Sequence, residues 1–279
     1  MTAYLRKALL GGSLIALVMS AVAPVSARAA TVEIYAAGSL RGVVSELARQ
    51  ADADFNIQVK PTFGGSGSLR ERIEKGERPD LLLSADLGAP QKLASLGRTV
   101  VPATAFARNR ICVISRRSSA VTAVNLIEKL LRKDMRVKTS VPVADPGGDY
   151  AWAVFDRIDA LKPGAGAILK AKAQSLMHIV PTTQAPGQNA TAALFASHQI
   201  DMALTYCSGA AALETALPEL TSLEVPPRLN PHPVYGMAVL SAKPDTLKLA
   251  LFLLSEKGQQ IIAGQGLVPT LGSSPAAPR

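Results

Sequence analysis

Three short segments combine small residues with hydroxyl or carboxyl groups, and each lies between a predicted strand and a predicted helix. They read Ala-Ala-Gly-Ser-Leu at 36–40, Phe-Gly-Gly-Ser-Gly-Ser-Leu at 63–69 and Asp-Pro-Gly-Gly-Asp at 145–149. The first turn of a helix has unpaired backbone N–H groups and the positive end of the helix dipole. Small residues admit a ligand close to that backbone, and a serine hydroxyl adds a rotatable donor. The pattern predicts anion binding.

The serines of the first two segments have different predicted roles. Ser68, with Glu71 three residues later, fits a capping box, so we expect Ser68 to cap its helix. Ser66 lies between two glycines and has no such duty. Ser39 is compatible with either a cap or a ligand donor. We therefore expect Ser39 and Ser66 to be the binding residues.

Catalytic motifs are incomplete around these serines. A nucleophile elbow requires glycine where Ser68 stands, and a dinucleotide-binding loop requires glycine where Arg70 stands. The three histidines are dispersed, so they form no recognisable metal motif and none has a motif relation to a serine. The sequence predicts a binding protein that is not an enzyme and has no cofactor. A serine hydrolase with Ser66 as nucleophile is the alternative of a different class.

Strand-length apolar runs alternate with helical patterns along the chain, beginning at 32–37 and again near Asn109. This alternation is typical of an α/β protein in which helices flank mostly parallel sheets. We expect two lobes with a cleft at the hinge. Residues 30–107 and 241–279 form the first lobe in this interpretation, and residues 108–240 form the second.

The first 29 residues have the features of a cleaved signal peptide. Arg6 and Lys7 precede an apolar run at 8–18, and small residues at 27–29 predict cleavage between Ala29 and Ala30. The apolar run is too short to cross about 30 Å of hydrocarbon comfortably. The sequence therefore predicts export to the periplasm.

The charge and the cysteines place further bounds on function. The formal net charge is +9, but the basic residues are scattered with few aromatics among them, which is unlike a nucleic-acid-binding face. Cys112 and Cys207 each lie at the end of a strand-like run. We expect them to be buried free thiols, although an exported protein permits a disulfide.

Four motifs taken together resemble the periplasmic molybdate-binding proteins of ABC importers. They are the segments at 36–40 and 63–69, Pro-Asp-Leu-Leu-Leu-Ser-Ala-Asp at 79–86, and Asp-Met-Ala-Leu-Thr-Tyr-Cys-Ser at 201–208. The resemblance runs in order over the mature chain. It implies a type II periplasmic-binding-protein fold with two lobes and a closing cleft. The implied partners are a small oxyanion and a membrane permease of an ABC importer; we expect a monomer that binds no nucleic acid.

The resemblance also implies which residues hold the ion. Carried over by position, the ligand-binding residues are Ser39 and Ser66 from the first lobe and Gly147 or Gly148, Gln188, Asn189 and Tyr206 from the second. Molybdate, or its near-isostere tungstate, is fully deprotonated at neutral pH and can only accept hydrogen bonds. Neutral donors satisfy such an ion without burying a counter-charge. Sulfate and phosphate are the alternatives within the same class of ligand, and a ferric site, which would use clustered tyrosines and acids, is less favoured.

One acidic residue bears on the choice of oxyanion. Asp149 begins the helix that follows the third segment, where it is either a cap that faces away or a carboxylate beside the ion. In the second case it would repel molybdate and accept the hydrogen of a protonated oxyanion such as hydrogen phosphate.

Overall fold

The computed structural model describes residues 30–184 and 188–270. The predicted signal peptide and its cleavage site at Ala29, together with the tail at 271–279, lie outside the described residues. Among the described residues, none of the helices has the length and apolar character needed to cross a membrane.

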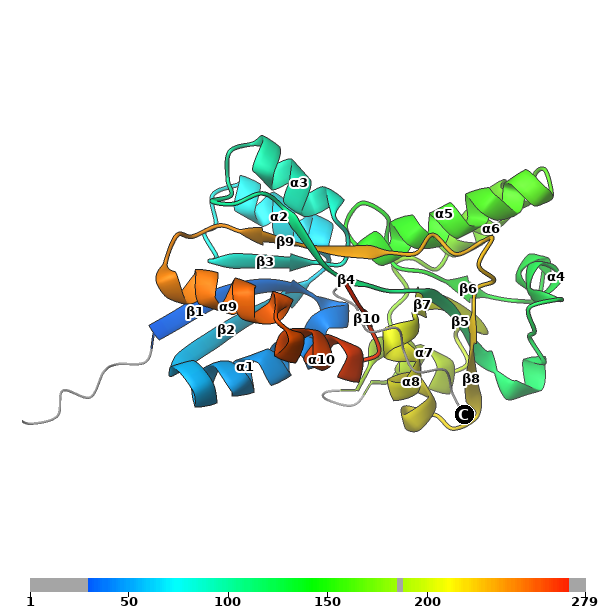
Figure 1. Ribbon diagram of the computed structural model, residues 1–279. Coiled ribbons are helices and arrows are strands. Elements are labelled where there is room, and N and C mark those ends of the chain that lie inside the picture. The colour runs from blue at the N-terminus through cyan, green and yellow to red at the C-terminus, as the bar shows by residue number, and fades with distance from the viewer. Residues whose placement is uncertain (1–29, 185–187, 271–279) are drawn as a thin grey trace, which may run out of the picture.

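The described strands form two sheets that lie side by side (Figure 1). The six-stranded sheet has the order β10-β4-β9-β3-β1-β2, and the four-stranded sheet has the order β6-β7-β5-β8. We call the six-stranded sheet with its helices the first lobe and the four-stranded sheet with its helices the second lobe. The strands are β1 (Ala30–Ala37), β2 (Ile57–Gly64), β3 (Leu81–Ser84), β4 (Thr104–Arg108), β5 (Ile111–Arg116), β6 (Val137–Lys138), β7 (Met202–Tyr206), β8 (Leu220–Glu224), β9 (Val234–Val239) and β10 (Val268–Pro269).

Helices cover both faces of each sheet, as Figure 1 shows. In the first lobe, α1, α9 and α10 lie on one face and α2 and α3 on the other; in the second lobe, α5 and α6 lie opposite α7 and α8. The helices are α1 (Arg41–Phe55), α2 (Ser66–Glu74), α3 (Gly88–Ser95), α4 (Leu126–Leu131), α5 (Pro146–Leu161), α6 (Ala165–Gln174), α7 (Ala190–Ala196), α8 (Ala210–Ala216), α9 (Pro244–Leu254) and α10 (Glu256–Gly264).

Helix α1 shows how the sequence directs these elements. Val43, Val44, Leu47 and Ala51 recur at helical spacing, and all four are buried against the first sheet. The helix ends at Asn56, which adopts the left-handed conformation typical of a helix C-terminus. Burial of this apolar stripe fixes the direction of α1, and therefore the place of the turn that precedes it.

The α/β fold is confirmed, but the sheets are mixed rather than mostly parallel. Among the described strands, the parallel pairs are β1–β2 and β1–β3 in the first sheet and β6–β7 in the second. Strand β9 is antiparallel to both β3 and β4, so it belongs to the first sheet. The expected boundary that ended the second lobe at residue 240 is therefore wrong. The apolar pattern of β9 predicts a strand but carries no information on which sheet it joins.

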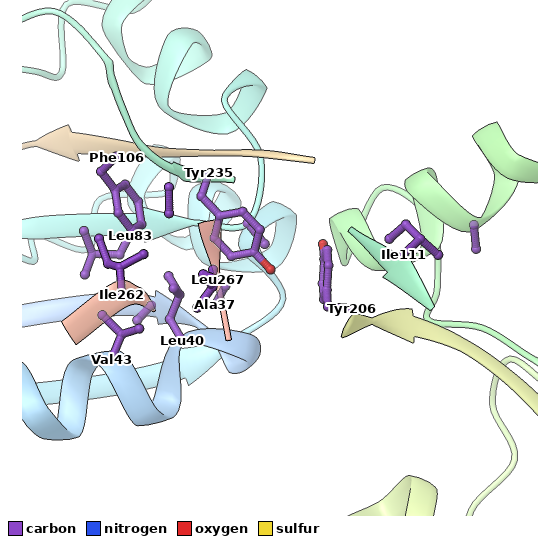
Figure 2. Close-up of a cluster of buried hydrophobic side chains, with 14 of the residues drawn as sticks. Ala37, Leu40, Val43, Leu83, Phe106, Ile111, Tyr206, Tyr235, Ile262 and Leu267 are labelled. Carbon is purple, nitrogen blue, oxygen red and sulfur yellow. The ribbon is translucent and has the colours of Figure 1, made fainter. Parts of the chain in front are cut away.

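A hydrophobic core runs through both lobes. It extends from β1 residues such as Ile34 to α5 residues such as Phe155. Tyr235 of β9 points from the first sheet toward the ring of Tyr206, which follows at the end of β7 in the second sheet (Figure 2). Their ring centroids are 5.5 Å apart with an edge-to-face arrangement. The chain passes between the lobes at residues 109–110 and again at 225–233, beside these rings.

The expectation of two free thiols is wrong, because Cys112 and Cys207 form a disulfide. Strands β5 and β7 are antiparallel neighbours, with Cys112 opposite Thr205 and Ile111 opposite Tyr206. This pairing brings the Cα atoms of the two cysteines to 4.9 Å, which is within the range that a disulfide spans. Two cysteines that are 95 positions apart in the sequence carry no sign of that register.

Replacing both cysteines with serine is expected to lower the free energy of unfolding by about 2–4 kcal/mol. The disulfide closes a long loop, and its removal gives the unfolded chain more conformational freedom. Urea unfolding of the double variant and the wild type would measure the difference. Equal midpoints in the two proteins would contradict the pairing of Cys112 with Cys207.

Candidate functional site

The two serine segments of the first lobe end neighbouring parallel strands. Ala37, the last residue of β1, lies opposite Gly64, the last residue of β2. The turns that carry Ser39 and Ser66 therefore follow from one edge of the sheet. The carboxyl ends of parallel strands in open α/β sheets are where ligands bind.

A cavity of about 460 Å³ opens at this edge, between the two lobes. Its wall combines the first turn after β1 with the end of β7 and the starts of α5 and α7. The lining residues are Ala37, Gly38, Ser39, Arg41, Gly42, Gly64, Ser140, Asp145, Asn189, Thr191, Thr205, Tyr206, Ser208, Gly209, Ala212, Leu213 and Gln265. Most of the polar groups among them are neutral, and the wall carries one cation, Arg41, and one carboxylate, Asp145.

Ser39 lies in a 3-10 turn (Gly38–Leu40) that precedes α1. Neither the turn nor α1 receives a side-chain cap, so the Ser39 hydroxyl is not used for capping. Its Oγ lies 2.9 Å from the hydroxyl of Tyr235. Nearby, the guanidinium of Arg41 stacks on the ring of Phe63 at 4.4 Å.

Tyr206 lines the cavity from the second lobe, and its side chain is only 7% exposed. Its hydroxyl is buried and has no hydrogen-bond partner among the described residues. Burial raises the pKa of Tyr206 well above its usual value, so the phenol keeps its hydrogen at neutral pH. A buried hydroxyl without a partner is costly, so the Tyr206 hydroxyl is a donor without an acceptor among the described residues, in a residue of the cavity wall.

Two other tyrosines pack around Tyr206, although they are far apart in the sequence. The Tyr150 ring centroid lies 6.2 Å from that of Tyr206, and the Tyr235 ring centroid lies 5.5 Å from it. Burial raises the pKa of Tyr150 to about 12 and raises that of Tyr235 as well. All three are therefore neutral phenols at neutral pH. Among the described residues, no cluster of three histidine, cysteine or acidic side chains could hold a metal ion.

Ser66 is fully buried and does not line the cavity. It is the first residue of α2, and its Oγ accepts a hydrogen bond from the backbone N–H of Ala85 at 3.0 Å. The hydroxyl therefore ties the start of α2 to the residue that follows β3. Because Oγ is the acceptor, its own hydrogen remains available for donation.

The capping-box assignment of Ser68 is wrong. Helix α2 begins at Ser66 with Gly65 as its N-cap residue, so Ser68 already lies inside the first turn. The backbone N–H of Ser68 donates to the carbonyl of Ala144 in the second lobe at 3.3 Å. The sequence pattern did not show that the glycines flanking Ser66 start the helix two residues earlier.

The glycines around Ser66 admit the backbone of the other lobe rather than a ligand. A Cβ atom on Gly67 would lie 1.8 Å from the carbonyl oxygen of Val143, and one on Gly65 would lie 2.2 Å from that of Ala144. Val143 itself has φ of 69°, a rare conformation for a β-branched residue. The segments at 63–69 and 143–145 thus form a direct contact between the lobes beside the cavity.

Gly147 and Gly148 lie in the first turn of α5, but their N–H groups are already used. Asp145 is the N-cap residue: its carboxylate accepts from the Gly147 N–H at 2.9 Å, and its carbonyl accepts from Gly148 N–H. Neither glycine lines the cavity. Asp145 does line it, so Asp145 is the acidic residue of the cavity wall.

Asp149 is directed elsewhere. Its Oδ1 accepts the backbone N–H of Val143 at 2.9 Å, and its side chain lines a separate hollow with Asp86 and His232. Burial raises the pKa of Asp149, with a smaller contribution from the negative charge of Asp86. Whether a carboxylate repels a dianion in the cavity, which the sequence left open for Asp149, is therefore a question about Asp145.

At the start of α7, only one of the two expected residues lines the cavity. Asn189 is the N-cap residue of α7, and its side-chain oxygen accepts from the N–H groups of Thr191 and Ala192. Asn189 also lines the cavity. Gln188 is a described residue that is absent from that wall. Ser208, two residues after Tyr206, lines the cavity but was missed as a site residue; its place beside the predicted tyrosine was the one available signal.

The whole described fold matches that of known binding proteins. The periplasmic molybdate-binding protein of Azotobacter vinelandii has a TM-score of 0.65 at 18% identity, with 85% of this chain and 98% of that chain covered. The sulfate-binding protein of Mycobacterium tuberculosis has a TM-score of 0.70 at 16% identity, with 87% and 88% covered. At these identities the likeness establishes the fold: a two-sheet periplasmic binding protein of type II.

The sequence itself gives the family. Residues 32–268 match the bacterial extracellular solute-binding proteins, and the chain belongs to that family. An uncharacterised protein of Pasteurella multocida is 31% identical over 240 residues, which are 85% of this chain and 98% of the relative. The chain is therefore an extracellular solute-binding protein rather than an enzyme.

Proposed function

We propose that this protein captures a tetrahedral oxyanion, molybdate or tungstate above all, in the cavity between Ser39 and Tyr206. It would then deliver the ion to the membrane permease of an ABC importer, after export to the periplasm by the signal at residues 1–29. The observation that carries the proposal is that Tyr206 lines the cavity and has a buried hydroxyl with no partner among the described residues.

The composition of the cavity wall supports an anion that accepts hydrogen bonds. Hydroxyl groups from both lobes, including Ser39, Tyr206 and Ser208, surround the space. Neutral donors stabilise an anion without a buried counter-charge. Because the donors come from both lobes, a bound ion would favour the closed arrangement of the lobes.

Hydrogen phosphate is the second candidate, and Asp145 is the observation that favours it. A carboxylate in the wall repels a fully deprotonated dianion but accepts the hydrogen of a protonated oxyanion. Sulfate, which has no hydrogen at neutral pH, belongs with molybdate in this respect.

A thermal-shift and calorimetric panel on the purified protein tests the proposal. Molybdate, tungstate, sulfate, phosphate and ferric ion would be compared at equal concentrations. An ion at 100 times its dissociation constant is expected to stabilise the protein by about 2.7 kcal/mol. Stabilisation by molybdate and tungstate supports the first candidate, and stabilisation by phosphate alone supports the second. A response to ferric ion alone, or to none of the five, would refute oxyanion capture.

A further inference from the structure

Asn109 lies at the first crossing between the lobes, where its side chain joins residues from both. It is 2% exposed and immediately follows β4. Its Nδ2 lies 3.1 Å from the hydroxyl of Tyr235 in the first lobe and 2.9 Å from Oγ of Ser208 in the second. Tyr235 in turn contacts Ser39 at 2.9 Å. The chain of hydrogen bonds therefore connects two serines on the cavity wall through a buried amide.

The orientation of this amide is fixed by the backbone. Oδ1 of Asn109 accepts the N–H of Arg110 at 2.8 Å. A backbone N–H can only donate, so the oxygen must face Arg110 and the NH₂ group must face the two hydroxyls. Asn109 is consequently a double donor to Tyr235 and Ser208.

The direction of the next hydrogen bond follows from burial. The hydroxyl of Tyr235 accepts from Asn109, and the ring is fully buried. Its single hydrogen has one acceptor among the described residues, Oγ of Ser39. If Ser39 donated instead, the Tyr235 hydrogen would be buried without a partner, which is unfavourable. Tyr235 is therefore the donor.

Each of the two serine hydroxyls thus accepts a hydrogen bond from another side chain of the protein. Ser39 accepts from Tyr235 and Ser208 accepts from Asn109, which leaves the hydrogen of each serine to be donated elsewhere. Both residues line the cavity, as does Tyr206, whose buried hydroxyl has no partner among the described residues. The hydroxyl hydrogens of Ser39 and Ser208 are therefore available to a ligand in the cavity.

We propose that Asn109 is a positioning residue that sets the direction of this network, so that Ser39 and Ser208 act as donors to the ligand. The inference deepens the proposed function and rests on it: the ligand presents hydrogen-bond acceptors to the Ser39, Ser208 and Tyr206 side of the cavity. It also assigns Ser208 to the binding site, as the counterpart in the second lobe of Ser39.

The test replaces the donor amide of Asn109 with a group that only accepts hydrogen bonds. In Asn109→Asp, one carboxylate oxygen still accepts from Arg110, but the other now accepts from Tyr235 and Ser208. The serine lone pairs then face the cavity, and the affinity for molybdate, measured by calorimetry, is expected to fall at least tenfold. Asn230→Asp is the matched control, because Asn230 is equally buried near the other crossing and its amide bonds only backbone groups. It is expected to lose stability while its affinity changes less than about threefold.

A double-mutant cycle separates network reversal from simple charge repulsion. If Asn109→Asp acts through Ser208, the fold-loss of molybdate affinity that it causes is at least three times smaller in the Ser208→Ala background than in the wild type. Additive effects, or equal affinity losses in Asn109→Asp and Asn230→Asp, would overturn the proposal.

The hydrogen positions can be tested without any ligand. Neutron diffraction of the deuterium-exchanged protein is expected to place the Tyr235 deuterium on the line to Ser39 Oγ. A deuterium directed from Ser39 to Tyr235 would refute the proposed direction. If the wild type bound no oxyanion but showed the expected deuterium, the proposed function would fail and the network direction would stand.

Discussion

Tyr206→Phe is expected to weaken oxyanion binding by about 1–3 kcal/mol, which is roughly a 5- to 150-fold loss of affinity. The variant removes a buried hydroxyl that has no partner among the described residues and that belongs to a residue of the cavity wall. In the complex, the ligand oxygen that this hydroxyl satisfies would be left without a donor. Calorimetric titration with molybdate or tungstate would measure the loss.

The same change is expected to leave the stability of the ligand-free protein unchanged or slightly increased. Phenylalanine retains the ring packing between Tyr150 and Tyr235 and removes an unsatisfied polar group. This separation of binding from stability distinguishes a ligand donor from a structural residue. Reduced urea stability of ligand-free Tyr206→Phe would show that the hydroxyl has a structural partner.

Tyr150→Phe is the matched control for this experiment. Tyr150 packs against Tyr206 but lines the separate hollow that contains Asp149. The Tyr150→Phe variant loses a phenol hydroxyl from a neighbouring ring, yet we expect its oxyanion affinity to remain close to that of the wild type. Equal losses in the two variants would place the ligand outside the cavity that contains Ser39.

Asp145→Asn is expected to shift the ligand preference away from hydrogen phosphate and toward the fully deprotonated oxyanions. The charge of Asp145 opposes a dianion in the same cavity, and such like-charge contacts at binding sites cost several kcal/mol. Its removal should raise the affinity for molybdate, tungstate and sulfate by roughly tenfold or more. The affinity for hydrogen phosphate should fall, because asparagine accepts the phosphate hydrogen less strongly than a carboxylate.

The substitution is conservative for the fold. Asparagine is as good an N-cap residue as aspartate, so the side-chain oxygen can still accept from Gly147 at the start of α5. Asp149→Asn is the control, since Asp149 bonds Val143 and lies outside the cavity. Equal shifts of the sulfate-to-phosphate affinity ratio in the two variants would show that Asp145 does not face the ligand.

Local sequence patterns predicted much of the fold. The apolar spacing of Val43, Val44 and Leu47 predicts α1, and the buried runs of β1 and β3 predict strands, because these patterns report which faces must leave water. The strand–turn–helix alternation gave the α/β class. Residues 234–239 were also predicted as a strand, but their assignment to the second lobe failed because strand pairing depends on distant partners.

The candidate site divides in the same way. Glycine and serine after a strand indicated the edge where Ser39 lies, and Tyr206 was located by its motif. The sequence could not show which aspartate of the segment 145–149 caps α5, because either Asp145 or Asp149 could be the residue before the first helical turn. Asn109 had no sequence signal, since its partners Tyr235 and Ser208 are about a hundred or more positions away.

The sequence by itself thus determined the elements, the family and the edge of the sheet where small residues and hydroxyls meet. The tertiary structure decided that the two cysteines pair, which acidic residue lines the cavity and which polar side chains meet at the crossing between the lobes. The physical reason is range: helices, strands and turns depend on neighbours a few residues away. A disulfide, a cavity wall and a buried hydrogen-bond network instead depend on groups that only folding brings together.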